Sequence, residues 1–279
     1  MCEGREGAYA GRIVRLKILA FVVAANAAAC GPPQAPMDLD SLGRFLLREW
    51  PATDPTPVQD GLVNLAKILA PLDLIHGLGN RSWTLTPPAA EDLTEITWPM
   101  DRKLIDNLGG SVARQSQWPV IDHARLQVSA DQLPIEPTAK TYVRHFVSPT
   151  DPSCFVDRTC LEIDTDNDIE RANAVLSVVF SNHKRFRWFK VGDAWAIVAR
   201  TWIDHSFDGS KGSLKQSYTL DIFMGRPDGT TWRYEAVWSE TQISISADSG
   251  TQLAVVTTAT DGAISTSDTV IGQRYHGMK

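Results

Sequence analysis

Residues 185–203 read RFRWFKVGDAWAIVARTWI, and this stretch most clearly determines the fold. Phe186 and Trp188 alternate with arginines, which is the period of two expected for a strand with one buried and one solvated face. Val191-Gly192-Asp193 has the composition of a tight turn, and residues 194–203 return as a second apolar run. The stretch therefore predicts a β-hairpin.

A second hairpin is predicted further along the chain. Residues 216–224 run into the turn 225–229, and residues 231–239 come back with aromatic side chains on one face. Further strands are predicted at Tyr142–Val147, Val175–Phe180 and Leu253–Thr258. The expected fold class is mainly β with N-terminal helices, its antiparallel strands forming a meander, a curved sheet or a barrel.

The N-terminal half shows helical signals separated by prolines. Residues 41–50 predict a short helix that ends at Pro51, and residues 58–74 recover a helical period. We divide the chain as follows: 1–29 signal peptide, 30–57 Pro-rich tether, 58–125 helical or irregular region packing on the β part, 126–260 antiparallel β domain, and 261–279 flexible tail.

Residues 12–30, RIVRLKILAFVVAANAAAC, have the order of a secretory signal peptide. A basic region is followed by an apolar region and then by small residues. The apolar run is shorter than the roughly 20 residues that a transmembrane helix needs. The segment therefore predicts export, by cleavage after the small residues.

Ala27-Ala28-Ala29-Cys30 resembles the lipobox of bacterial lipoproteins, although that family usually has leucine at the position of Ala27. The resemblance implies that Cys30 becomes the acylated N-terminus and that the membrane is a partner through this anchor. In diderm bacteria, Gly31 rather than aspartate after the cysteine favours the outer membrane over the inner one. The alternative is ordinary cleavage, which would leave a secreted or periplasmic protein.

Cys154 and Cys160 are the two remaining cysteines of the mature chain. In an oxidising compartment they predict a short-loop disulfide. A metal site or free thiols are the alternatives, and His145 is the nearest further metal ligand in sequence.

Charge argues against nucleic acid as a partner. The chain has a formal net charge of -6, and residues 1–29 hold four basic and two acidic side chains, so the remainder carries -8. An acidic body does not attract nucleic acid or anionic lipid through its net charge.

Nine tryptophans form either a large core or the walls of an apolar cavity. The candidate ligand-lining residues are Trp188, Trp202, Trp232, Tyr234 and Trp238.

The mature region lacks the nucleophile-elbow, zinc-protease, phosphate-loop and dinucleotide-binding motifs. We assign no catalytic residue and expect no cofactor and no metal site. The acidic run 164–170 predicts a solvated turn, with a calcium site as the alternative.

The sequence thus predicts an exported, lipid-anchored envelope protein with a non-enzymatic binding or structural role. Its partner would be an apolar small molecule or another envelope protein. One alternative is a protein-docking assembly factor that uses an exposed sheet edge or helix 58–70. A second is an envelope hydrolase, whose candidate residues would be His145, His183, His205, Asp164, Asp166 and Asp204.

Overall fold

The computed structural model describes residues 33–172, 176–243 and 248–277. The predicted signal segment and Cys30 lie outside the described residues. Residues Ala35–Lys279 form a compact unit, which holds every element named below.

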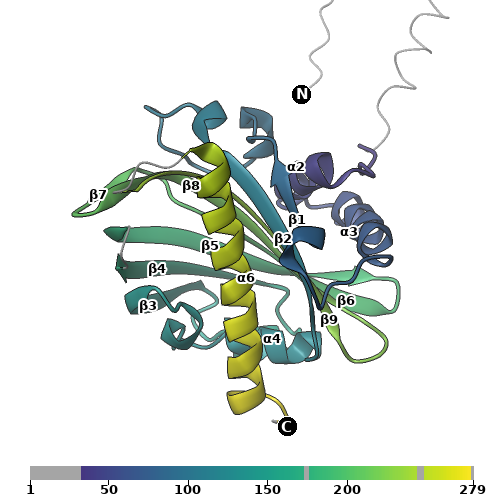
Figure 1. Cartoon of the computed structure of the whole chain (residues 1–279). Helices are drawn as coiled ribbons and strands as arrows, with labels where there is room; N and C mark the ends of the chain where they lie inside the picture. The colour runs from purple at the N-terminus through teal and green to yellow at the C-terminus, as the bar shows by residue number, and fades with distance from the viewer. Residues whose placement is uncertain (1–32, 173–175, 244–247, 278–279) are drawn as a thin grey trace, which may run out of the picture. The chain divides into compact units, whose positions relative to one another are not determined.

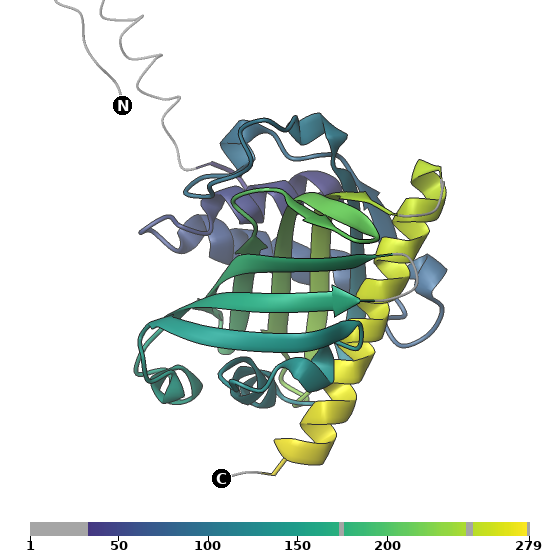
Figure 2. The same cartoon turned by 90° about the vertical axis from the view of Figure 1, so that its left-hand side faces the viewer.

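A nine-stranded antiparallel sheet is the centre of this unit, with the strand order β1-β2-β9-β8-β6-β5-β4-β3 and with β7 paired to β8 (Figure 1). The sheet is strongly curved and does not close into a barrel (Figure 2). This confirms the predicted mainly β class. The strands are β1 (Ser82–Leu85), β2 (Leu108–Ser116), β3 (Ala139–Ser148), β4 (Glu162–Ala172), β5 (Ser177–Val191), β6 (Ala194–Trp202), β7 (Phe207–Gly209), β8 (Gly212–Gly225) and β9 (Thr231–Gln242).

Five α-helices and four short 3-10 helices complete the described fold. The α-helices are α2 (Leu39–Glu49), α3 (Thr56–Leu69), α4 (Val120–Gln127), α5 (Ser153–Asp157) and α6 (Ser249–Arg274). The 3-10 helices are η2 (Leu78–Asn80), η3 (Ala90–Asp92), η4 (Leu104–Asp106) and η5 (Leu133–Ile135). The helix predicted at residues 41–50 is α2, and the period from residue 58 belongs to α3.

Both predicted hairpins are present. Strands β5 and β6 pair up to Val191 opposite Ala194, and Gly192 in the turn takes a positive φ of 59° that favours glycine. Strands β8 and β9 pair along most of their length. The acidic run at residues 164–170 is part of β4 rather than a turn, because Asp164, Asp166 and Asp168 alternate with buried residues along that strand.

The two faces of the sheet are covered differently. Helices α2 and α3 pack on one face, which we call the helix-pair face, and bury a large cluster that includes Trp50, Tyr218 and Trp238. On the opposite face, α4 and α5 cover one part, where Phe155, Phe186 and other residues form a second cluster. Helix α6 crosses the remaining part of that face (Figures 1 and 2).

The structure differs from the sequence-based prediction at the C-terminus. Residues 249–274 form one long helix, so residues 253–258 are not a strand and residues 261–274 are not a frayed tail. The buried face of α6 consists largely of threonine, serine and single aliphatic residues, which is why no strong apolar period marks the helix in the sequence. Asp248 accepts a hydrogen bond from the Thr251 backbone and caps the helix, and this was a local signal for it.

The region 58–125 also contains more sheet than predicted, since β1 and β2 fall within it. Gly109 and Gly110 weaken the strand signal of β2. A Cβ on Gly109 would lie 2.5 Å from the Leu85 carbonyl oxygen, and one on Gly110 would lie 2.7 Å from Leu253 of α6. These glycines therefore allow β1 and α6 to approach β2 closely.

Candidate functional site

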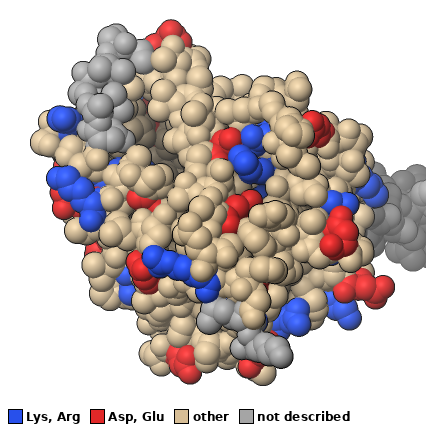
Figure 3. Space-filling model, turned by 60° about the horizontal axis from the view of Figure 1, so that its bottom comes forward, with Lys and Arg blue, Asp and Glu red and all other residues tan. Residues whose placement is uncertain are grey.

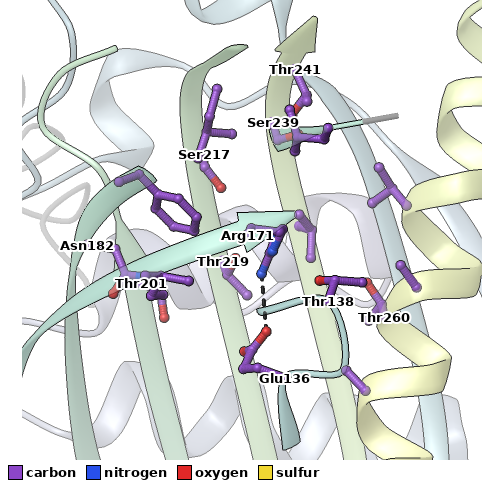
Figure 4. Close-up of a pocket in the computed structure, with 18 of the residues that line it drawn as sticks. Glu136, Thr138, Arg171, Asn182, Thr201, Ser217, Thr219, Ser239, Thr241 and Thr260 are labelled. Carbon is purple, nitrogen blue, oxygen red and sulfur yellow. Dashed lines mark hydrogen bonds and ion pairs between the residues drawn. The ribbon is translucent and has the colours of Figure 1, made fainter. Parts of the chain in front are cut away.

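A cavity of about 460 Å³ lies between the sheet and α6 (Figure 4). Its walls come from β4, β5, β6, β8 and β9, from β3 and the segment before it, from the start of β2, and from α6. The volume falls in the range of about 300–1,000 Å³ that small-molecule sites occupy. The cavity is therefore large enough to hold a ligand.

Strand register arranges the cavity walls in layers. One row crosses four strands as Lys184, Thr201, Thr219 and Val237. Because side chains on one face recur every second residue, the neighbouring rows on this face are found two residues away. The neighbouring row on the side of the α4 cluster contains Asp221 and Glu235, which lie opposite each other. The neighbouring row on the other side contains Ser217 and Ser239.

The middle of the cavity is lined by hydroxyl groups (Figure 4). Ser239 and Thr241 hydrogen-bond each other at 3.0 Å. Within the part of the chain that the structure describes, the hydroxyls of Thr201, Ser217 and Thr219 have no hydrogen-bond partner. They face the cavity and are free to bind a ligand or water.

Beyond the hydroxyl layer the cavity wall is apolar. Phe180, Val178 and Ile203 belong to a buried cluster there, and α6 adds aliphatic side chains from the other side. The apolar lining residues include Ile169, Leu176, Val178, Phe180, Ile203, Leu214, Val237, Val255, Val256, Ala259 and Ala263.

The opposite end of the cavity is charged. Asp221 is buried between Lys184, whose Nζ lies 3.8 Å away, and Arg233, whose guanidinium lies 3.1 Å away. Glu235 lies directly across from Asp221 on β9. Among the described residues Glu235 has neither a hydrogen bond nor an ion pair.

Burial shifts the pKa values of both cavity-lining ionisable groups at this end. It raises the pKa of Glu235 to about 8, and the nearby Asp221 carboxylate adds to the shift. Burial also lowers the pKa of the Lys184 ammonium, against the opposing effect of Asp221. The charged end therefore favours a neutral Glu235 at neutral pH.

Arg144 adds further positive charge behind this end. It is 7% exposed and donates hydrogen bonds to Asn167, the Gln127 carbonyl and the Tyr142 hydroxyl. No carboxylate within the described ranges lies within 4.0 Å of its guanidinium. Its charge is thus not balanced by a direct partner.

Glu136 and Arg171 form an ion pair at 3.1 Å in the cavity wall (Figure 4). The Arg171 guanidinium also lies 5.5 Å from the centre of the Phe180 ring. Because the two charges balance each other, this pair adds no net charge to the cavity.

Of the five aromatic residues predicted to line a cavity, Trp202 alone borders it, and Trp202 also belongs to the buried cluster on the helix-pair face. Trp188 packs on Phe155 in the cluster under α4 and α5, at a ring distance of 5.4 Å. Trp232, Tyr234 and Trp238 lie on the helix-pair face, against α2 and α3. Alternation correctly grouped these three residues, but the cavity is on the other face of β9.

The structure contains the disulfide expected from the sequence, between Cys154 in α5 and Cys160, with an S–S distance of 2.16 Å. It links the two ends of the α5 segment, beside the cluster that contains Phe155 and Trp188.

The histidine and aspartate residues of the hydrolase alternative lie outside the cavity wall. His183 contacts Asp166 at 2.7 Å and Asp204 at 3.6 Å, and His205 contacts Asp204 at 2.5 Å. The other two are paired elsewhere: His145 with Asp168 and Asp164 with Arg185. The His183 group is partly exposed, and within the described ranges no three His, Cys, Asp or Glu residues are placed to hold a metal ion.

Docking through helix 58–70 would be favoured by an apolar outer face of α3. Val58, Leu62, Leu65 and Leu69 of this helix are buried in the cluster on the helix-pair face. Val63 is 39% exposed and is the one large apolar side chain of α3 that is open to solvent. The apolar face of α3 is therefore used within the fold.

The charged surface is mixed on the face drawn in Figure 3, where acidic and basic side chains are interspersed among uncharged ones. Each described helix is too short or too polar to cross a bilayer.

No protein-family model matches this chain, and no curated protein sequence matches it. Among solved structures, the chain is similar to a STAR-related lipid transfer protein fragment from Xanthomonas axonopodis, with a TM-score of 0.42 and 13% identity over 60% of this chain and 86% of that one. It is also similar to a conserved protein from Geobacillus kaustophilus, with a TM-score of 0.39 and 10% identity over 61% of this chain and 98% of that one. A Chromobacterium violaceum protein gives a TM-score of 0.28 and 9% identity over 58% and 96% of the two chains. At these identities and TM-scores we interpret the cavity from its own residues alone.

Proposed function

We propose that this protein is an exported, lipid-anchored binding protein of the cell envelope, which holds a small amphipathic molecule between its sheet and α6. The cavity is the single observation that carries this proposal. Its charged end, hydroxyl layer and apolar wall follow one another in space. A ligand with a polar head and an apolar chain matches that order.

Free polar groups inside the cavity support ligand binding. The hydroxyls of Thr201, Ser217 and Thr219, together with the Glu235 carboxyl, have no partner among the described residues. Polar groups in a protein interior are normally hydrogen-bonded, and those facing a cavity find their partners in water or ligand. A bound head group would provide such partners.

Three features support export and anchoring. Residues 12–29 have the order of a signal peptide, and Cys30 follows a lipobox-like run of alanines. The disulfide between Cys154 and Cys160 is of the kind that persists in oxidising compartments. We expect an acylated Cys30 to hold the domain at a membrane, with the outer membrane favoured by Gly31.

A second candidate function is acid–base catalysis in the same cavity. A carboxyl with a raised pKa beside a lysine with a lowered pKa is the pattern that many active sites show. Conversion of a bound molecule, rather than its release unchanged, would favour this candidate.

Native mass spectrometry of the protein purified from its own membranes tests the binding proposal. We expect an added mass that is lost on denaturation and is recovered as an intact small molecule. Ala263→Trp, which fills the cavity from α6, should abolish the added mass. Ala254→Trp is the matched control, because Ala254 lies on the same helix and is exposed outside the cavity. Binding that survives Ala263→Trp would contradict the proposal.

The intact mass after denaturation tests the anchor separately. We expect a chain that begins at Cys30 with fatty acyl groups attached, and a Cys30→Ser variant that is released from the membrane fraction. An unmodified full-length chain would contradict export and anchoring and leave the cavity proposal standing.

A further inference from the structure

The charged end of the cavity holds an excess of positive charge. Lys184 and Arg233 both face Asp221, and Asp221 balances one of them. Glu235 is the fourth group, and burial favours its neutral form. With Glu235 protonated, two cations and one carboxylate leave a net charge of +1 at this end.

Lys184 is the cation that a ligand can reach. It lines the cavity, and its Nζ lies 3.8 Å from Asp221, beyond hydrogen-bonding distance. Its other close neighbour is the face of the Phe186 ring, whose centre lies 4.9 Å away. An ammonium has three N–H donors. Those of Lys184 are therefore free for an acceptor in the cavity.

We propose that the ligand is a single-chain amphiphile with one carboxylate head group, bound between Lys184 and Glu235 with its chain along the apolar wall. This inference rests on the proposed binding function and names the ligand class for the same cavity.

Each protein group around the ligand's head group favours an anionic head group over an amine or an alcohol. The Lys184 ammonium would pair with the carboxylate, and the neutral Glu235 would donate its O–H to a carboxylate oxygen. Thr201 and Thr219 lie in the same row as Lys184 and offer hydroxyl donors. An amine head would instead be repelled by Lys184 and Arg233, and an alcohol head would leave Lys184 without an ionic partner.

A single negative charge fits this end better than two. With Glu235 neutral, the residues that line this end carry a charge of +1 from Lys184, because Arg144 and Arg233 lie outside the cavity wall and Arg144 is engaged in three hydrogen bonds. Arg171 lines the cavity but is already paired with Glu136. A carboxylate therefore neutralises the site, whereas a phosphate dianion would exceed its charge.

Charged side chains from four different segments of the chain act on the Glu235 carboxyl. Arg233 on β9, Asp221 on β8, Lys184 on β5 and Glu136 before β3 all act on it. Helix α6 carries two acidic groups, Asp261 and Asp268, and β2 carries the basic group Arg114. Asp261 is paired with Arg81 and Arg114. His123 on α4 is buried beside Arg233, and burial keeps its pKa well below the ordinary value, so it is neutral.

Ionisation of Glu235 would oppose a bound carboxylate. Affinity for the ligand should therefore fall as the pH rises past neutrality, when Glu235 loses its proton. In Glu235→Gln the side chain stays a neutral donor, so the part of this pH dependence that comes from Glu235 should disappear.

Calorimetric titration of the delipidated full-length mature protein with dodecanoate, dodecanol and dodecylamine tests the inference, since these probes share one chain. We expect dodecanoate to bind about tenfold more tightly than dodecanol, and dodecylamine to bind most weakly. Lys184→Met should remove the preference for dodecanoate. Lys190→Met is the matched control, because Lys190 lies on the same strand and is exposed. A preference for dodecylamine or dodecanol, or one unchanged in a folded Lys184→Met, would overturn the carboxylate assignment.

Glu235→Gln provides a second variant that keeps the volume of the site. We expect it to bind dodecanoate with a flatter pH profile between about pH 6 and pH 9 than the wild type. An identical profile would overturn the role of Glu235. If no probe binds while native mass spectrometry still shows an added mass that Ala263→Trp removes, the carboxylate assignment fails and the binding function stands. If that added mass is also absent, both fail.

Discussion

Strand β9 contributes to both faces of the sheet, and the two faces differ in composition and packing. Tyr234, Ala236 and Trp238 are almost fully buried against α2 and α3. Their neighbours Glu235 and Ser239 point into the cavity under α6. One face of the sheet is therefore filled by packing against helices, whereas part of the other face lines a cavity with polar side chains. Four changes test this division, beginning with the largest expected effect.

Trp238→Ala should strongly destabilise the helix-pair face. The side chain is fully buried, and its indole N–H donates to the Thr86 carbonyl at 2.9 Å. Replacing a buried tryptophan by alanine leaves a cavity and lowers the free energy of unfolding by about 3–5 kcal/mol. Val237→Ala on the cavity face should cost less than about 1.5 kcal/mol, because its side chain is partly exposed to the cavity and a smaller substitution removes fewer packed atoms. Urea unfolding of both variants measures the difference, and equal losses would contradict the division.

Asp261→Asn should loosen α6 over the cavity. Asp261 pairs with Arg81, which is 4% exposed, and with Arg114 at 3.2 Å. Loss of the carboxylate leaves Arg81 without its ion partner, at a cost of about 2 kcal/mol. Hydrogen exchange should be faster along α6, with little change in the strands under α2 and α3.

The same ion pair predicts a pH dependence. Burial opposes but does not outweigh the Arg81 and Arg114 contacts, so the folded pKa of Asp261 is lowered. The stabilisation is therefore complete above the unfolded pKa of about 4 and is lost as the pH falls through the folded pKa. The Asp261→Asn variant should lack the part of the acid-induced loss of stability that comes from protonation of Asp261. Identical acid unfolding curves for the wild type and the variant would contradict this prediction.

Glu235→Gln should increase stability at alkaline pH. The folded pKa of Glu235 is raised to about 8, so the folded state holds its proton more tightly than the unfolded state does. Stability from this group is complete below the unfolded pKa of about 4.3 and is lost as the pH rises toward the folded value. At pH 9 we expect the variant to gain at least about 1.4 kcal/mol, the equivalent of one pKa unit. Melting curves at pH 4, pH 6 and pH 9 should show a gain that is absent at pH 4 and grows with pH.

Thr219→Val should have the smallest effect on stability. Its hydroxyl faces the cavity and has no partner among the described residues, so we expect a change within about 0.5 kcal/mol. Thr165→Val is the control, since the Thr165 hydroxyl donates to the Lys184 carbonyl at 3.1 Å and its loss should cost about 1 kcal/mol. A larger loss in Thr219→Val would mean that the cavity hydroxyls stabilise the fold.

Local patterns in the sequence were enough to predict the β5–β6 and β8–β9 hairpins, helix α2 and the disulfide. Each depends on residues near one another in the chain: alternation across a pleat, a turn containing Gly192, a proline after the helix, and two cysteines six residues apart. The cavity depends on distant segments. Lys184, Thr219 and Glu235 meet only because their strands are neighbours in the sheet.

By itself, the sequence determined which side chains of β9 share a face, because alternation is a property of the strand alone. Only the tertiary structure decided which of those faces is filled and which is hollow. That choice depends on where α2, α3 and α6 pack. Helix α6 is itself the clearest case: its threonines and serines carry little apolar period, and it forms where Gly110 of β2 lets it lie close to the sheet.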